Sequence, residues 1–192
     1  MSPHDGPLTS ACVSVRLASA PDREHVVTTI VEAFRQDPAF AYFFPDRSRY
    51  DVNAAAFAAS LFDARMPEGT VWTAGAGDAV ALWDGPAPGP RKPMDLPAEV
   101  LERLRVYNAA IHGALPSTPH WYLGVLATHP NAAGRGLGRA AMAAGLARAG
   151  DLPAYLETSN PVNVEIYRRA GWAVESEHKV DDLPVWIMRY QG

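Results

Sequence analysis

Alternating and periodic apolar positions in the first third of the chain predict a strand followed by helices. Residues 13–18 alternate apolar and polar side chains, which is typical of a strand. A helix-start signal comes next, and apolar residues then recur about every four positions as far as Gln36, which predicts an amphipathic helix. The aromatic, proline-broken segment 37–50 predicts a loop or a short helix. Residues 51–66 predict a further helix with its large apolar side chains facing inward.

The middle of the chain predicts a hairpin, a loop and one helix. Two short apolar runs, residues 70–73 and 79–83, are separated by a glycine-rich connection that is typical of a hairpin. Residues 84–97 are dense in proline and glycine and predict a loop. Residues 97–113 then predict a helix.

The last third of the chain alternates strands and helices around a glycine-rich turn. Residues 121–150 predict a strand, the turn and a helix, in that order. A strand, a helix closed by a glycine and two final strands are predicted at 154–158, 163–170, 173–180 and 185–190. The predicted fold class is mixed α/β (α+β), and its first half is largely antiparallel because the early strands form a hairpin.

Length and charge limit the classes of function. A chain of 192 residues suits one domain with a sizeable core, and we expect a disordered leader over 1–11 and a single domain over 12–192. The net charge is −4 and no basic run occurs, so neither nucleic acid nor a membrane surface is an expected partner. No apolar run approaches the roughly 18 residues of a membrane span.

Cysteine usage and the N-terminal residues favour a cytoplasmic location. Cys12 is the only cysteine, so no intramolecular disulfide can form. The first residues lack the charged and apolar regions of a signal peptide. Arginine far outnumbers lysine and alanine is abundant, which points to a bacterial source. We expect a monomer or a homodimer.

The glycine-rich turn is the strongest chemical signal in the chain. Gly134, Gly136 and Gly138 lie between a strand-sized apolar run and a run of helix formers. Glycines let the backbone approach a ligand closely, and the free N–H groups of a first helical turn bind phosphate oxygens. Arg135 and Arg139 add positive charge at the same place. The turn therefore predicts a site for a phosphate-bearing ligand.

Three kinds of phosphate ligand compete for this turn. A P-loop needs Lys followed by Ser or Thr after the last glycine, but Arg139 and Ala140 stand there. A dinucleotide, and with it an oxidoreductase, would suit the G-x-G-x-x-A spacing of residues 136–141 and Glu157 at about the ribose-binding distance. Most of the chain precedes this motif, however, and the segment after it is too short for a doubly wound parallel sheet. The third ligand is coenzyme A.

Segments of the second half resemble the GNAT acetyltransferase superfamily. Leu126–Pro130, Ala133–Arg139 and Asn163–Trp172 match the strand, the R/Q-x-x-G-x-G/A pyrophosphate turn and the later Asn…Tyr…Gly-Phe segment of that superfamily. Ala133 stands where the turn usually begins with Gln or Arg, and Trp172 stands in place of Phe. The resemblance implies a central, largely antiparallel, twisted sheet of about six to seven strands flanked by helices.

Further segments resemble puromycin N-acetyltransferase-like proteins within that superfamily. These are His120–Leu123, Leu156–Ser159, the Asn163…Tyr167…Gly171 pattern, and Ala33-Phe34 followed by Asp37-Pro38. Segments 37–66 and 84–118, where acceptor specificity is expected, match poorly, so puromycin is not carried over as the acceptor.

The resemblance implies acetyl-CoA as cosubstrate, with no metal. The residues that it places on the coenzyme are Leu126, Ala127, Thr128, Ala133, Gly134, Arg135, Gly136, Leu137, Gly138, Arg139, Asn163 and Tyr167. It also places the Tyr167 hydroxyl beside the sulfur, as the proton donor to the departing thiolate. Spacing alone favours a tyrosine that packs its ring on the core with its hydroxyl in water, and it is the motif around Tyr167 that favours the donor role. Asn163 is expected to cap the helix that carries Tyr167, and Asn160 is an alternative for the contact with the coenzyme.

Glu157 is the candidate for handling the proton of the amine. It lies in the middle of an apolar strand, where burial would raise the pKa of its carboxyl and suit it to accept a proton or hold a cationic amine. The alternative is an outward strand residue in solvent. His120 and His129 flank the strand at 121–127 and could relay a proton, although such residues are more often ordinary strand-end side chains. Ser159 lacks the Gly-x-Ser-x-Gly elbow of a nucleophile.

The sequence thus predicts transfer of an acetyl group from acetyl-CoA to a primary amine of a small molecule, such as an antibiotic or related metabolite, by direct attack in a ternary complex. Acceptor contacts are predicted at Tyr42, Phe43, Trp121 and Glu157. The alternatives are an acyl-CoA-binding sensor without turnover and the dinucleotide-dependent oxidoreductase. The scattered histidines and the lone cysteine have no metal-ligand spacing, so no metal site is expected.

Overall fold

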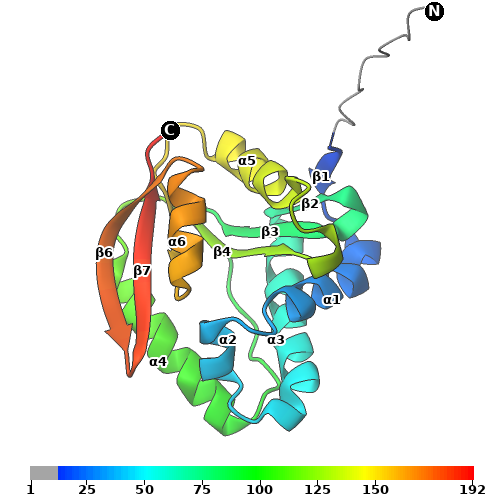
Figure 1. Ribbon diagram of the computed structural model, residues 1–192, viewed down its shortest axis with the longest axis vertical. Coiled ribbons are helices and arrows are strands. Elements are labelled where there is room, and N and C mark those ends of the chain that lie inside the picture. The colour runs from blue at the N-terminus through cyan, green and yellow to red at the C-terminus, as the bar shows by residue number, and fades with distance from the viewer. Residues whose placement is uncertain (1–12) are drawn as a thin grey trace, which may run out of the picture.

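The computed structural model describes residues 13–192, so the predicted leader over 1–11 lies outside the described residues. A seven-stranded sheet runs through this part in the order β1-β2-β3-β4-β5-β7-β6 (Figure 1). Every neighbouring pair is antiparallel except β4 and β5. The predicted mixed α/β class with a largely antiparallel sheet is confirmed. The strands are β1 Val15–Leu17, β2 Val71–Ala74, β3 Ala79–Asp84, β4 Trp121–Thr128, β5 Ala154–Thr158, β6 Trp172–Val180 and β7 Leu183–Tyr190.

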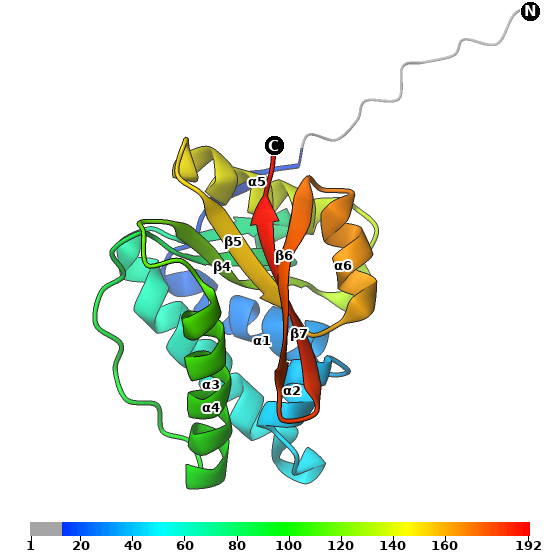
Figure 2. The same ribbon diagram turned by 90° about the vertical axis from the view of Figure 1, so that its left-hand side faces the viewer.

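Helices cover both faces of the sheet (Figures 1 and 2). One layer packs α5 and α6 against the sheet, and the other layer holds α1 to α4. The tip of the long β6–β7 hairpin reaches α2, where the Tyr42 hydroxyl donates to Asp181 at 2.8 Å. None of the helices between residues 13 and 192 is long and apolar enough to cross a membrane. The helices are α1 Arg23–Ala33, α2 Pro38–Phe43, α3 Tyr50–Arg65, α4 Ala98–Ala114, α5 Leu137–Ala149 and α6 Pro161–Arg168.

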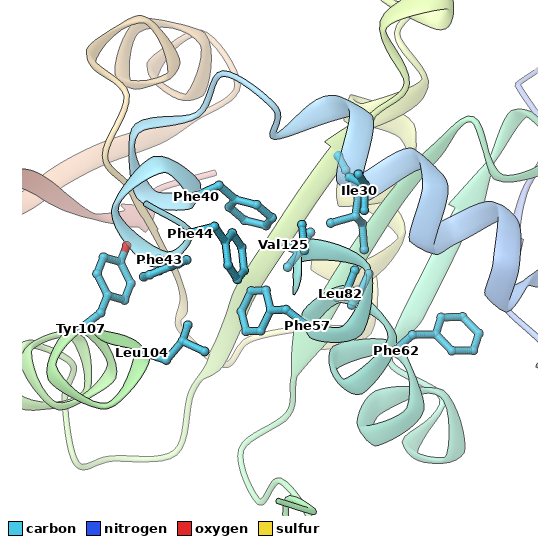
Figure 3. Packing of buried hydrophobic residues seen from close by; sticks show 14 of the residues in the cluster. Ile30, Phe40, Phe43, Phe44, Phe57, Phe62, Leu82, Leu104, Tyr107 and Val125 are labelled. Atoms are coloured by element: carbon cyan, nitrogen blue, oxygen red, sulfur yellow. The ribbon is translucent and has the colours of Figure 1, made fainter. Parts of the chain in front are cut away.

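Segment 37–50 forms a short helix, because Asp37 caps it. The Asp37 side chain accepts from the amides of Ala39 and Phe40, at 2.9 and 3.3 Å, and proline occupies the first helical position. The aromatic side chains of this segment then meet α3 and the sheet. Figure 3 shows Phe40 and Phe44 close to Val125 of β4. This packing fixes α2 over the middle of β4.

A β-bulge in β4 decides which of its side chains face which layer. Leu82 of β3 pairs with Val125 and Trp83 pairs with Leu123, so Gly124 is the extra residue. Before the bulge Leu123 packs in the α5–α6 layer, and after it Val125 packs in the α1–α4 layer. Because the bulge shifts the alternation by one residue, Tyr122 and Val125 face the same layer, three positions apart.

A tryptophan cluster under α5 explains why that helix contains Gly145. Trp83 packs against Trp121 and Trp172, with ring centroids 6.4 and 6.5 Å apart, and is fully buried. A Cβ at Gly145 would lie 2.1 Å from Nε1 of Trp83. The helix can approach the sheet this closely only because the residue has no side chain.

Replacing Gly145 by alanine should therefore destabilise the protein. Overpacking of this kind costs about 2 kcal/mol, more than the roughly 1 kcal/mol that alanine gains over glycine in a helix. The matched control is Gly113→Ala in α4, where a Cβ meets nothing within 4 Å, and it should be neutral or stabilising. Urea unfolding of both variants tests this, and a Gly145→Ala protein as stable as Gly113→Ala would contradict it.

Candidate functional site

A cavity lies where β4 and β5 part. The two strands pair from Trp121 and Ala154 only as far as Leu123 and Leu156, although both continue. The space beyond, about 880 Å3 including its open mouth, is bordered by both strands, by α2, α3, α4 and α6, and by Phe34 just after α1. Its size is that of a small-molecule site. Its lining includes Phe34, Asp37, Phe40, Phe43, Phe57, Arg65, Tyr107, Tyr122, Gly124, Leu126, Glu157, Ser159, Asn163 and Tyr167.

Glu157 faces this cavity from β5 and is held by two tyrosines. The hydroxyl of Tyr122 donates to Oε2 of Glu157, and the hydroxyl of Tyr107 donates to Oε1 at 3.4 Å. Burial raises the pKa of the Glu157 carboxyl to about 7, and the two tyrosine hydrogen bonds oppose part of that rise. Of the two expected positions for Glu157, the structure shows the one in a cleft rather than in open solvent.

Tyr167 enters the same cavity from α6. Its ring packs edge-on against Trp172, with centroids 6.3 Å apart, and its neighbourhood includes the charges of Glu157 and Asp37. Burial, and after it those two negative charges, raises the pKa of the Tyr167 phenol. The hydroxyl therefore stays protonated at neutral pH and is available as a donor.

The predicted cap of α6 is wrong by three residues. The side chain of Asn160, not of Asn163, accepts from the amide of Val162 at 3.0 Å and begins the helix. Pro161 explains the earlier start, because proline favours the first helical position and needs no hydrogen-bond acceptor there. Asn163 is left free of a capping role and lines the cavity.

The glycine-rich turn comes after β4 and opens α5. Gly134 and Gly136 have φ of 77° and 74°, a region that disfavours side chains. Gly138 packs on β4, where a Cβ would lie 2.7 Å from Oγ1 of Thr128. In the described part of the chain the amides of residues 134–139 donate to no protein acceptor, and Gly136 offers no side-chain cap. Arg135 and Arg139 are exposed beside them.

The remaining residues predicted for the coenzyme lie along the same path. Leu126 lines the cavity, Ala127 is buried in the α1–α4 layer, and Thr128 contacts Gly138. Ala133 ends the short turn Pro130–Ala132, and Leu137 is buried as the first residue of α5. The Ala133 side chain is exposed. The backbone from Leu126 to Arg139 therefore runs from the cavity to the exposed turn.

Two of the residues predicted to contact the acceptor lie away from the cavity. Phe43 and Glu157 line it, but Trp121 packs against Trp72 and Trp83 in the α5–α6 layer. Tyr42 binds Asp181 through its hydroxyl, with Arg103 over its ring. His120 and His129 are also outside: His120 bonds to the Thr118 carbonyl, and His129 accepts from the Asn131 amide.

The polar residues of the cavity that sequence reasoning missed include Asp37, Arg65, Tyr107 and Tyr122. Only Tyr122 carried a local signal, because a glycine inside a strand indicates a bulge and Gly124 lies two residues after it. The other three come from the segment before α2, from α3 and from α4, and only tertiary packing brings them to Glu157. Between residues 13 and 192, no group of three His, Cys, Asp or Glu side chains is placed to hold a metal ion.

Comparison with known proteins gives the same fold. Residues 102–172 match the acetyltransferase (GNAT) family. The structure is similar to a Corynebacterium glutamicum protein described as histone acetyltransferase HPA2 and related acetyltransferase, at 27% identity over 92% of this chain and 94% of that one, with a TM-score of 0.69. These matches support the GNAT acetyltransferase superfamily. A member of this superfamily is expected to have N-acetyltransferase activity and to use acetyl-CoA.

Structures of lower identity show a likeness of fold alone. A GCN5-related N-acetyltransferase from Rhodopseudomonas palustris is 17% identical over 97% of this chain and all of that one, with a TM-score of 0.60. A mosquito arylalkylamine N-acetyltransferase-like protein is 13% identical over 93% of this chain and 99% of that one, with a TM-score of 0.61. The predicted likeness to puromycin N-acetyltransferase-like proteins stays a prediction.

Proposed function

We propose that this protein transfers an acetyl group from acetyl-CoA to the primary amine of a small molecule, by direct attack in a ternary complex. The observation that carries the proposal is the shared cavity of Glu157 and Tyr167, with a proton acceptor on one side and a proton donor on the other. The mosquito relative, whose description names an arylalkylamine acetyltransferase, is consistent with a small amine as acceptor.

The turn at 134–139 fits the pyrophosphate of a coenzyme. Six consecutive amides without protein acceptors, two glycines with positive φ and two exposed arginines form an anion cradle at the start of α5. Leu126 connects this cradle to the cavity along β4, and Asn163 and Tyr167 border the cavity from α6. We assign these residues to acetyl-CoA, which would supply the activated thioester.

The two side chains divide the proton transfers between them. An amine enters as a cation and must lose a proton before its nitrogen can attack the carbonyl carbon. Glu157, with a pKa of about 7, is ionised often enough at neutral pH to accept that proton. As the new C–N bond forms and the C–S bond breaks, the Tyr167 hydroxyl donates its proton to the departing thiolate. Solvent then returns a proton to Tyr167 and removes one from Glu157.

The sheet argues against the dinucleotide alternative. That motif opens the alternating units of a parallel sheet, whereas β4 and β5 are the one parallel pair among the strands described. A sensor without turnover would use the anion cradle but has no need of a carboxyl with a raised pKa facing a tyrosine hydroxyl. Glu157 therefore favours an enzyme.

Thermal shift and thiol release together test the proposal. Acetyl-CoA and CoA should raise the melting temperature, and NAD and ATP should not. Gly138→Val should abolish that shift, because its side chain would displace Thr128, while the exposed Gly113→Ala variant should keep it. We then expect release of free thiol from acetyl-CoA in the presence of a panel of primary amines. Binding of acetyl-CoA without thiol release from any amine would indicate the sensor instead.

A further inference from the structure

Two unpartnered polar groups mark a second contact point in the cavity. Among the described residues, five buried side-chain polar atoms have no hydrogen-bond partner. Nε1 of Trp83 and Trp172 lie in the tryptophan cluster, and Nε of Arg103 lies outside the cavity. The other two, Nε of Arg65 and Oγ of Ser159, belong to residues that line the cavity. Buried polar groups are normally satisfied, so these two groups in the cavity lining call for a ligand.

Arg65 is held so that its Nε remains the free group. It is only 6% exposed; its Nη2 donates to Asp84 at 2.7 Å, and its Nη1 donates to the Leu61 carbonyl at 3.3 Å. Nη2 also lies beside Gly124, where a Cβ would be 3.4 Å away, which places the guanidinium at the bulge of β4. A guanidinium only donates hydrogen bonds, so Nε requires an acceptor atom from the ligand.

The charges around the cavity indicate an uncharged acceptor atom. Asp84 pairs with both Arg65 and Arg91, and Glu68 lies beside Arg91, so two carboxylates balance the two guanidiniums. The carboxyl groups of Glu157 and Asp37 also line the cavity, and Arg65 is its one basic side chain among the described residues. A carboxylate on the substrate would meet these carboxyl groups without an unpaired cation to offset them. An ester, amide or ether oxygen meets no such repulsion.

We propose that the acetyl acceptor is an amine with an apolar, preferably aromatic, body and an uncharged oxygen. This oxygen accepts a hydrogen bond from Nε of Arg65. This inference rests on the proposed function and adds the substrate class. Phe34, Phe40 and Phe43 form the apolar wall for the body of the molecule. Ser159, 3% exposed, offers a second unpartnered hydroxyl in the lining of the cavity. Arg65 is thus a specificity-determining residue.

The test measures binding of acetylated products, so that it depends neither on turnover nor on the pKa of the amine. Calorimetry on the CoA-loaded protein compares N-acetylphenylalanine methyl ester, N-acetylphenethylamine and N-acetylphenylalanine. The methyl ester differs from N-acetylphenethylamine by an added uncharged acceptor group. N-acetylphenylalanine differs from it by an added carboxylate. We expect the ester to bind about tenfold tighter than the phenethylamine product, the gain of one charge-assisted hydrogen bond, and tighter than the carboxylate.

Arg65→Lys keeps the positive charge for Asp84 but removes Nε, so the ratio of ester to phenethylamine affinities should fall toward one. Arg23→Lys is the matched control, because Arg23 forms an exposed pair with Asp63 of α3, and it should keep the wild-type ratio. If Arg65→Lys does not fold, Ser159→Ala should lower the same ratio. Equal wild-type affinities, or an equal loss for both ligands in the variants, would overturn the inference. If the ester binds more tightly but no amine causes release of thiol from acetyl-CoA, the proposed acetyl transfer is rejected and the inference about Arg65 stands.

Discussion

Replacing Tyr167 by phenylalanine should lower kcat by roughly a hundredfold and change the affinity for acetyl-CoA by less than about threefold. The phenylalanine ring keeps the packing on Trp172, so the fold and the bound coenzyme should be preserved. Only the hydroxyl is lost, and burial keeps that hydroxyl protonated at neutral pH. Without it the departing thiolate loses the proton donor that we assign to it.

A second tyrosine on the same tryptophan provides the control. The ring of Tyr190 lies 5.3 Å from that of Trp172, closer than Tyr167, but Tyr190 does not line the cavity. Tyr190→Phe should therefore leave kcat unchanged. Steady-state thiol release gives kcat, and calorimetry gives the acetyl-CoA affinity. A Tyr167→Phe enzyme with wild-type kcat would show that Tyr167 only packs.

The parts of the site that the sequence predicted are those that local chemistry determines. The turn from Gly134 to Arg139 needs only glycines, a strand before it and a helix after it, all close together in the chain. Glu157 was predictable because a single carboxylate in an apolar strand must face either a cleft or solvent. The caps were less certain: Asn160 and Asn163 are both good caps, and Pro161 decided between them.

The parts that the sequence did not predict depend on the third dimension. Trp121 and Tyr122 are neighbours in one aromatic run, and the β-bulge at Gly124 sets which side chains of β4 reach the cavity layer. Tyr42 and Phe43 are also neighbours in the chain that point in different directions. The Tyr42 hydroxyl contacts Asp181, whereas Phe43 lines the cavity. Arg65 is held beside β4 by its ion pair with Asp84, which lies on another element.

Replacing Glu157 by glutamine should lower kcat/KM by roughly a hundredfold and remove a step from the pH profile. In the wild-type enzyme the rate should rise with pH through about 7, because only the ionised carboxyl accepts the proton of the amine. The glutamine can accept from the hydroxyl of one tyrosine and donate its amide N–H to the hydroxyl oxygen of the other, but it cannot titrate. The rise near pH 7 should disappear, and only the titration of the amine itself should remain, at higher pH.

Stability gives an independent measure of the same carboxyl. The folded-state pKa of Glu157, about 7, lies above its ordinary value of 4.5, so the unfolded chain ionises first as the pH rises. Below pH 4.5 the carboxyl is protonated in both the folded and the unfolded state, so it does not lower the free energy of unfolding. Between pH 4.5 and 7 the free energy of unfolding of the wild type should fall by about 3 kcal/mol relative to that of Glu157→Gln. Urea unfolding at about pH 5 and about pH 8, on either side of the folded-state pKa, measures this difference. Glu175→Gln, at an exposed position of β6, should follow the wild type in both assays, and a persisting step in Glu157→Gln would assign the proton to another group.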